Sequence, residues 1–348
     1  MYAITHSTRT NAGDFLIHER CRALIERWAR PDAIEVVYAR EALDDVLDVV
    51  NSANVLVLCG GPAYQRNFYP GCIPLVQPLD RIEVPIAPMA IGLGTGVHED
   101  ELESFTFDQP SRDALRLIHD RIDHSSVRDV LTERVLRRHG IENVVTTGCA
   151  AWYHPEHTEK DFTAPEQISH VAVSGPGMNH FRQATGLLKL IRRKFPKARR
   201  TIMFHGRFRQ IVSPQKSGLR RHNLKLAAYA KLHGYRVINA SGSTHKLDEY
   251  GKCDLHVGYR VHAHLDALSR RTPSLLLQED TRGIGQSLTL GTDDVNARDA
   301  DALGQVSERL DAYLRSNFEP FHVVVETMKQ KHATMVRFLK TLPGAPSD

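Results

Sequence analysis

Residues 254–263 (DLHVGYRVHA) combine an apolar strand pattern with two side chains suited to chemistry. A predicted strand over residues 254–258 ends at a glycine, and Arg260 and His262 follow where a helix over residues 263–270 is predicted. In parallel α/β sheets, ligands bind beyond the carboxyl ends of strands. The Arg260 guanidinium can bind a carboxylate or phosphate, and the His262 imidazole can donate or accept a proton near neutral pH. The segment predicts an anion site with an acid–base group.

Two more arginines follow the predicted strand over residues 200–204. Arg207 and Arg209 come directly after its carboxyl end, the side of the sheet where ligands bind. We take both as candidate substrate-binding residues that would clamp a carboxylate or phosphate. Solvated surface charge is the competing interpretation.

The sequence Asn11-Ala-Gly13-Asp14 opens a predicted helix over residues 11–28. The first backbone N–H groups of a helix are unpaired and lie at the positive end of its dipole, so this position can hold an anion. Asn11 and Gly13 are therefore candidate substrate-binding residues, and Asp14 is a candidate base. Capping of the helix by Asn11 or Asp14 is the alternative.

Glycines follow predicted strands at two further places. Gly60 and Gly61 end the strand over residues 54–59, and Gly175 and Gly177 separate the strand over residues 170–174 from a helix. Glycine lets a ligand approach the backbone closely, and small residues at a strand–helix junction expose helix N–H groups to a phosphate. All four are candidate substrate-binding residues, with tight turns as the alternative.

Charge is unevenly distributed along the chain. Residues 167–236 contain sixteen Lys and Arg and no Asp or Glu, whereas the rest of the chain carries a net charge of −12. Such a basic surface attracts a phosphorylated substrate, an anionic membrane face or nucleic acid. The densest tract, residues 189–200, is a candidate for peripheral contact with an anionic membrane. Nucleic acid is not expected, because the sequence has no recognition motif or aromatic stacking platform.

Other classes of site are disfavoured by the sequence. The five cysteines include no Cys-x-x-Cys pair and the nineteen histidines form no His-Glu-x-x-His motif, so neither a disulfide framework nor a metal site is expected. No Gly-x-Gly-x-x-Gly fingerprint supports a nicotinamide cofactor. The longest apolar runs span about five residues, far short of the roughly 20 that cross a membrane. We expect a cytoplasmic protein without a cofactor, with the inner membrane face as a candidate peripheral site.

Strands and helices alternate along the chain, which favours parallel sheets built from crossover connections. Predicted strands cover residues 33–38, 54–59, 86–93, 126–128, 143–146, 170–174, 200–204, 235–238, 254–258 and 274–277. Predicted helices cover residues 11–28, 41–50, 111–123, 129–139, 179–195, 219–233, 263–270, 300–316 and 323–342.

A polar segment divides this alternation in two. Residues 152–167 (WYHPEHTEKDFTAPEQ) contain two prolines and are typical of a linker. We therefore predict an α/β protein with two Rossmann-like domains, at residues 1–151 and 168–320, that face each other across a cleft. The last segment, residues 321–348, is expected to form a helix and is a candidate to pack back on the first domain.

The sequence resembles the polysaccharide pyruvyl transferase family. Most specific is Gly258-x-Arg260-x-His262 followed by Thr272-Pro273 and an acidic strand end. The other shared motifs are Asn-x-Gly-Asp at residues 11–14, the strand into Gly60-Gly61, the strand running to Gly96, and Val127-Arg128-Asp129 followed by Leu136 and Gly140-Ile141. The chain departs from the family pattern at Pro62, at Thr132 and at Cys149.

The resemblance implies a fold like that of the GT-B glycosyltransferases. It implies transfer of pyruvate from phosphoenolpyruvate to two hydroxyls of a sugar in a polysaccharide, such as an exopolysaccharide, or in a lipid-linked precursor, forming a cyclic ketal. It places Arg260 and His262 at the phosphoenolpyruvate site, with phosphoenolpyruvate as a donor substrate and no cofactor. In this scheme the second domain holds the donor and the first domain holds the acceptor. His262 is then the candidate general acid.

Two alternatives share the same architecture. A glycosyltransferase that uses a nucleotide sugar would bind UDP or GDP and would not bind phosphoenolpyruvate. A non-catalytic protein that binds a sugar phosphate or lipid phosphate would bind its ligand without releasing phosphate, since a fold does not fix a function.

Overall fold

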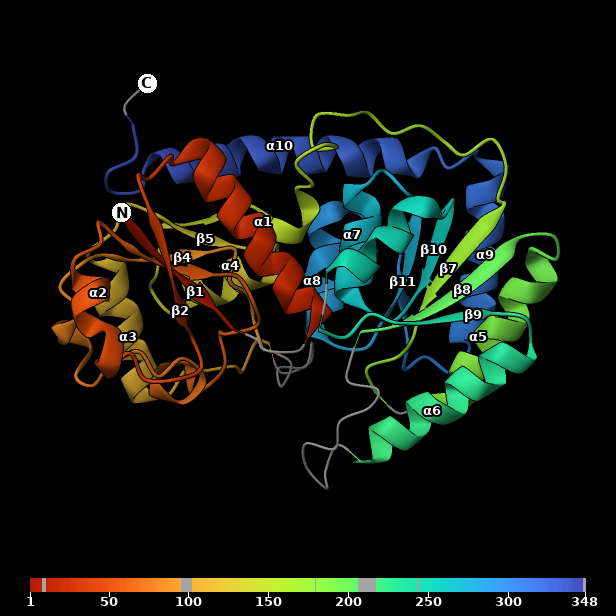
Figure 1. The fold of residues 1–348 in the computed structure, drawn as a ribbon, viewed down its shortest axis with the longest axis horizontal. Coiled ribbons are helices and arrows are strands. Elements are labelled where there is room, and N and C mark those ends of the chain that lie inside the picture. The colour runs from red at the N-terminus through yellow and green to blue at the C-terminus, as the bar shows by residue number, and fades with distance from the viewer. Residues whose placement is uncertain (8–10, 95–101, 179, 206–216, 243, 347–348) are drawn as a thin grey trace.

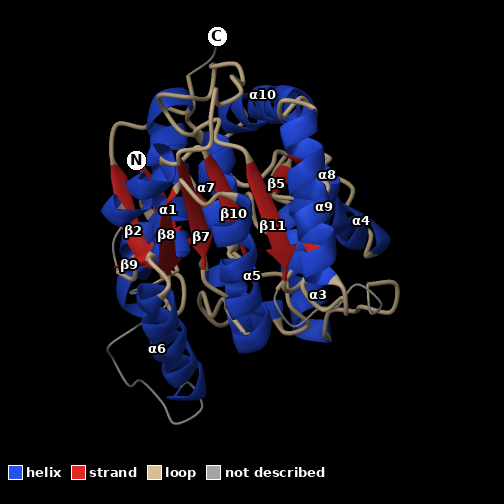
Figure 2. Cartoon of the chain, turned by 90° about the vertical axis from the view of Figure 1, so that its right-hand side faces the viewer, coloured by secondary structure: helices blue, strands red, loops and turns tan. Residues whose placement is uncertain are grey.

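The computed structural model describes residues 1–7, 11–94, 102–178, 180–205, 217–242 and 244–346. Within these residues the chain forms two α/β units that lie side by side, each built around a parallel sheet (Figure 1). Helices lie on the faces of both sheets, as right-handed crossovers between parallel strands require (Figure 2). The predicted class, α/β with two Rossmann-like domains, is therefore confirmed.

The first unit contains a four-stranded sheet with the order β2-β1-β3-β4. Its strands are β1 (Tyr2–His6), β2 (Ile34–Tyr38), β3 (Leu56–Cys59) and β4 (Ile86–Met89). β1 pairs with both β2 and β3, with Ala3 opposite Glu35 on one side and Leu56 on the other. A second small sheet pairs β5 (Ser125–Val127) with β6 (Val144–Thr146), and a bridge from Ile91 to Val127 links it to the chain after β4.

Four helices accompany these strands. They are α1 (Ala12–Trp28), α2 (Leu47–Asn51), α3 (Gln109–His119) and α4 (Val130–Arg138). Side-chain caps fix where α1 and α4 begin, because Asn11 accepts a hydrogen bond from the Gly13 N–H and Asp129 accepts one from the Thr132 N–H. These caps place Asp14 and Asp129 at the end of the first unit that faces the second.

The second unit contains a six-stranded parallel sheet with the order β12-β11-β10-β7-β8-β9. Its strands are β7 (His170–Ser174), β8 (Arg199–Phe204), β9 (Arg236–Asn239), β10 (Leu255–Gly258), β11 (Ser274–Gln278) and β12 (Val295–Asn296). Its helices are α5 (Phe181–Lys194), α6 (Ser217–Leu232), α7 (Val261–Ser269), α8 (Thr281–Leu290) and α9 (Ala302–Arg315). The central strands β7 and β10 are fully buried, as expected for a sheet covered on both faces.

Helix α8 joins the two units. The indole N–H of Trp152, a fully buried side chain, donates to Gln286 at 2.8 Å, and the Gln286 amide donates to the Arg128 carbonyl at 3.1 Å. The Val130 N–H of α4 donates to the Thr289 hydroxyl at 3.0 Å. These buried hydrogen bonds fix the first turn of α4 against α8, which positions Arg128 and Asp129 beside the second unit.

The last helix, α10 (Pro320–Lys340), runs back along the molecule and contacts α1, β5 and β6 of the first unit (Figure 1). Its buried side chains, including Phe321, Val325 and Met335, join one apolar core with residues of α1 and of the second sheet. No helix among the described residues is both long enough and apolar enough to cross a membrane.

Three elements are missing from the sequence predictions, and two others differ clearly in extent. β1, β12 and α8 were not predicted, although β1 is an inner strand of its sheet. The predicted strand over residues 86–93 ends at Met89, because Ala90 takes a left-handed backbone conformation with φ of 54°. The predicted helix over residues 41–50 is a 3₁₀ turn followed by the short helix α2.

Candidate functional site

A small cavity lies where the start of α1 meets the carboxyl ends of strands β10 and β11. Its lining residues are Asn11, His205, Tyr259, Arg260, Val261, His262, Glu279, Asp280 and Arg282. The cavity therefore brings together three predicted site residues, Asn11 of the first unit and Arg260 and His262 of the second. The sequence placed them at helix starts, and the structure puts those helix starts face to face.

His262 lies in the first turn of α7, after Arg260 at the N-cap position. The helix start of the first unit packs directly against it, because a Cβ built on Gly13 would lie 2.1 Å from His262 Nδ1. Only glycine allows this approach at residue 13. Gly13 therefore positions the imidazole through close backbone contact, a role different from the predicted direct contact with substrate.

The charge state of His262 follows from its surroundings. Burial, together with the positive charges of Arg282, Arg128 and Arg260, lowers its pKa to about 3. The imidazole is therefore neutral at physiological pH in these surroundings. An anion bound among these arginines would oppose their field and raise the pKa of His262.

The Gly13 contact leads to a mutational prediction. Gly13→Ala places a methyl group where the His262 ring now lies, so the ring must shift. A displacement of about 1 Å at a reacting group costs up to about 100-fold in rate. We expect the rate of catalysis at this site to fall 10- to 100-fold while the far-ultraviolet circular dichroism spectrum stays unchanged. Wild-type turnover in Gly13→Ala would show that the ring position does not matter.

A second prediction concerns stability at low pH. His262 in the folded protein stays unprotonated until its pKa of about 3, whereas in the unfolded chain it takes up a proton below about 6.5. The neutral imidazole therefore contributes fully to the free energy of unfolding above pH 6.5, and this contribution is lost as the pH falls from 6.5 toward 3. We expect the wild type to lose roughly 1.5 kcal/mol more unfolding free energy than His262→Asn between pH 6.5 and 5. Urea unfolding at both pH values measures this, and equal losses would contradict it.

Arg260 lies between a glycine and a carboxylate of the second unit. A Cβ on Gly177 would lie 2.4 Å from Arg260 Nη1 and 2.9 Å from Glu279 Oε2, so glycine is required there for the two groups to fit. Burial raises the pKa of the Glu279 carboxyl, and the charge of Arg260 opposes this effect. The opposite charges of Glu279 and Arg260 therefore attract each other in the lining of the cavity.

The predicted anion site at Gly175 and Gly177 needs correction. The Gly175 N–H donates to the Met203 carbonyl at 2.8 Å, and the Gly177 and Met178 N–H groups donate to the Glu279 carboxylate at 2.9 to 3.0 Å. Because these donors already have partners, they do not form the predicted phosphate cradle. Gly177 contributes instead by leaving room for Arg260.

Arg128 and Arg282 complete the cluster of cations around His262. Arg128 is buried, donates to the Leu93 carbonyl at 2.7 Å and pairs with Asp129 at 3.0 Å. Arg282 lies at the start of α8 and forms a two-pronged ion pair with Asp280, whose carboxylate also accepts the Arg282 backbone N–H and caps that helix. Sequence reasoning missed both as site residues. The available signals were the position of Arg128 at a predicted strand end and of Arg282 after the acidic end of β11.

Asp14 lies within the field of arginines from both units. Burial raises the pKa of its carboxyl, and the charges of Arg282, Arg40, Arg260 and Arg128 oppose the rise. A carboxylate with a raised pKa is a stronger base than an ordinary aspartate. Asp14 follows Gly13, so the candidate base belongs to the helix start that packs against the candidate acid, His262.

Gly60 and Gly61 line a different cavity, at the carboxyl ends of β1 and β3. Its polar lining comes from Thr5, Ser7 and Arg40, and both glycines have left-handed backbone angles, with φ of 56° and 88°. The predicted contact of these glycines with substrate remains a proposal for the first-unit side of the site. Arg207 and Arg209 lie outside the described residues.

One group of potential metal ligands occurs in the described part of the chain. Ligand atoms of His154, Glu156 and His157 lie within 4.8 Å of one another. Burial lowers the pKa of His154 to about 3, and the positive charges of Arg20 and Arg270 add to this effect. The same two charges would oppose a bound cation. We therefore assign no metal to this group. All five cysteines are buried, and none of them forms a disulfide bond.

The two α/β units, each built around a parallel sheet, have a fold like that of the GT-B glycosyltransferases. The cationic site lies where the two units meet. The chain belongs to the polysaccharide pyruvyl transferase family, since the model of that family matches residues 11–281. This confirms the family predicted from the sequence motifs. No curated protein matches the chain in sequence.

Several solved structures share the fold. They include UDP-GlcNAc 2-epimerase from Neisseria meningitidis bound to UDP-GlcNAc, with 12% identity, a TM-score of 0.55 and alignment over 97% of this chain and 99% of that chain. The S. aureus MnaA–UDP co-structure has 12% identity, a TM-score of 0.56 and coverage of 97% and 95%. The Methanocaldococcus jannaschii epimerase in complex with UDP-GlcNAc and UDP has 13% identity, a TM-score of 0.53 and coverage of 94% and 99%. At these identities the likeness concerns the fold alone.

Proposed function

We propose that the protein transfers pyruvate from phosphoenolpyruvate to two hydroxyls of a saccharide and forms a cyclic ketal. The observation that carries this proposal is that Arg260 and Arg282 line one cavity with His262, while the charge of Arg128 acts on the same imidazole. Phosphoenolpyruvate has a carboxylate and a phosphate close together, and binding both requires several cations at one place. Membership in the pyruvyl transferase family supports a saccharide acceptor.

In the proposed mechanism His262 donates the proton that phosphoenolpyruvate takes up at C3. This step leaves positive charge at C2, where a sugar hydroxyl adds as its proton passes to a base. Asp14 is the candidate for that base. The bond between C2 and the phosphate oxygen then breaks, and a second hydroxyl adds to C2 and closes the ketal as its proton passes to the leaving phosphate. The proton that Asp14 takes from the first hydroxyl replaces the one that His262 gives to C3. The methyl group, the hydrogen phosphate and the two new C–O bonds therefore account for all atoms of donor and acceptor.

Binding of the donor would change the charge state of His262, which is neutral among the protein groups alone. The carboxylate and phosphate bring negative charge into a field otherwise set by three arginines. This charge would raise the pKa of His262 and allow it to carry the proton needed at C3. Arg260 and Arg282 would then balance the charge that develops on the leaving phosphate.

The basic tract over residues 189–200 is proposed to steer anions or an anionic membrane toward the second unit. On α5 and the turn after it, Lys189, Arg192, Arg193 and Lys197 are exposed to solvent. Peripheral attachment at the inner membrane face would bring the enzyme to a lipid-linked acceptor, and long-range attraction of this kind weakens as salt increases.

A labelling experiment tests the proposed reaction. The protein is incubated with phosphoenolpyruvate labelled with ¹³C at C2 and with a pool of saccharide precursors. We expect labelled carbon in a saccharide-bound ketal, together with equimolar phosphate. Label that stays in phosphoenolpyruvate, while UDP is released from a nucleotide sugar, would favour the glycosyltransferase alternative.

A further inference from the structure

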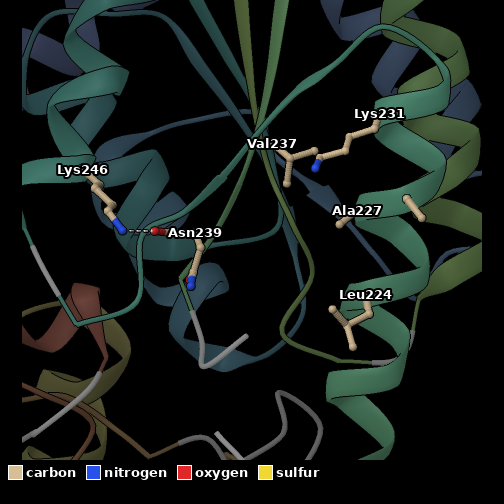
Figure 3. Close-up of a pocket in the computed structure, with 7 residues that line it drawn as sticks. Leu224, Ala227, Lys231, Val237, Asn239 and Lys246 are labelled. Atoms are coloured by element: carbon tan, nitrogen blue, oxygen red, sulfur yellow. Dashed lines mark hydrogen bonds between the residues drawn. The ribbon is translucent and has the colours of Figure 1, made fainter. Parts of the chain in front are cut away.

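A groove in the second unit lies away from the candidate site and is not used by the proposed reaction. It runs between α6 and the edge strand β9 and has a volume of about 580 Å³ (Figure 3). Its lining residues are Leu224, Ala227, Ala228, Lys231, Val237, Asn239 and Lys246. The groove therefore combines an apolar lining with two lysines.

The lysines lie on opposite sides of the groove. Lys231 comes from α6, whereas Lys246 belongs to the 3₁₀ segment His245–Lys252 and donates to the Asn239 carbonyl at 2.7 Å (Figure 3). An apolar channel between two ammonium groups fits a molecule with an apolar chain and an anionic head.

The outer face of α6 continues this surface. Leu224, Ala228 and Leu232, spaced four residues apart, are exposed on one side of the helix, and Leu224 and Leu232 have exposed fractions of 42% and 85%. Arg221 and Lys225 are exposed on the same side, and the buried side of α6 includes Leu226 and Ala230. Leucines among cations on an exposed helix face are typical of helices that lie in a membrane interface.

The positive charge around the groove and the outer face of α6 favours one kind of binding partner over the others. Residues 167–236 contain no acidic residue, so neither α5 nor α6 supplies a carboxylate to neutralise these cations. A second copy of the chain would bring like charges together on this face, which opposes self-association. Nucleic acid would satisfy the cations but would leave Leu232 exposed. An anionic lipid bilayer satisfies both the cations and the leucines.

We propose that the outer face of α6 and the adjoining groove dock the protein on an anionic lipid membrane, with Leu224 and Leu232 inserted at the level of the headgroups. The docking itself is independent of the proposed reaction. A statement about the acceptor rests on the proposed function as well. If both hold, the acceptor is a saccharide carried on a membrane lipid.

Vesicle co-sedimentation tests the docking. The wild type should sediment with phosphatidylcholine vesicles that contain phosphatidylglycerol and should stay in solution with phosphatidylcholine alone. We expect Leu224→Gln/Leu232→Gln and Lys225→Glu/Lys231→Glu each to lower the partition coefficient at least about tenfold. The matched control is Leu288→Gln/Leu314→Gln, which changes two leucines exposed on α8 and α9 and should bind as the wild type does.

Three results would overturn the proposal. The first is that the wild type fails to sediment with anionic vesicles. The second is that the lysine substitutions weaken binding but the leucine substitutions do not. The third is that Lys189→Glu/Arg193→Glu loses vesicle binding while the α6 variants keep it. Titration of the same variants with phosphoenolpyruvate separates the two hypotheses. Vesicle binding without phosphoenolpyruvate binding would contradict the proposed function alone.

Discussion

His262→Asn is expected to lower kcat for pyruvyl transfer by about 10²- to 10⁴-fold, the usual contribution of a general acid. Asparagine keeps a polar group of similar size beside Gly13 but cannot carry a proton to C3 of the donor. The three arginines that surround His262 remain in place, so affinity for phosphoenolpyruvate should change only a few-fold. Single-turnover release of phosphate measures the rate, and calorimetry measures the affinity.

His245→Asn is the matched control for this variant. His245 belongs to the same unit and its side chain is almost fully exposed, so its loss should leave both quantities unchanged. Normal turnover in His262→Asn would remove the imidazole from the mechanism. A loss of affinity as large as the loss of rate would instead assign His262 to donor binding.

Arg260→Ala is expected to weaken phosphoenolpyruvate binding by about 30-fold to several thousand-fold. This range corresponds to the roughly 2–5 kcal/mol lost when one partner of a buried charge pair is truncated. The loss should be this large because Arg260 lines the cavity, and its truncation would leave the bound anion without that cation. Arg260→Lys should recover only part of the affinity, since lysine cannot form a two-pronged contact.

Arg236→Gln provides the control for the arginine variants. Arg236 lies on the edge strand β9 of the same unit, is more than half exposed and pairs with Glu249. Its substitution should leave the affinity for phosphoenolpyruvate within about twofold, as expected for a weak surface ion pair. Equal effects of Arg260→Ala and Arg236→Gln would mean that only net charge attracts the donor.

Most strands and helices could be predicted because their apolar patterns are long and end at glycine or a cap. Residues 54–59 and 170–174 are apolar runs followed by glycine, and both form buried strands. β1 was missed because its apolar run is short: Tyr2, Ala3 and Ile4 are followed at once by polar residues. Its strand conformation depends on pairing with both β2 and β3, which a local pattern does not contain.

Helix α8 shows why part of the site could not be predicted. Its sequence, TRGIGQSLTL, contains two glycines, and glycine disfavours a helix. The structure gives the reason for one of them, because a Cβ on Gly285 would lie 2.7 Å from the Asp129 carboxyl carbon. The second glycine thus permits contact between units that are far apart in sequence.

The same contact between the units brings Arg128 and Arg282 to His262. Arg260 and His262 could be predicted because they lie at one strand–helix junction. The approach of Arg128 depends on the hydrogen bond from Gln286 to its carbonyl, and the approach of Gly13 depends on the packing of α1. Both arise from tertiary structure.

Calorimetric titration with phosphoenolpyruvate, beside UDP and GDP, tests most directly that this site takes a phosphoenolpyruvate donor. We expect saturable binding of phosphoenolpyruvate to the wild type, loss of that binding in Arg260→Ala, and no binding of either nucleotide. Binding of UDP or GDP in place of phosphoenolpyruvate would contradict the proposed donor and would leave the chain with the fold of the family but a different donor.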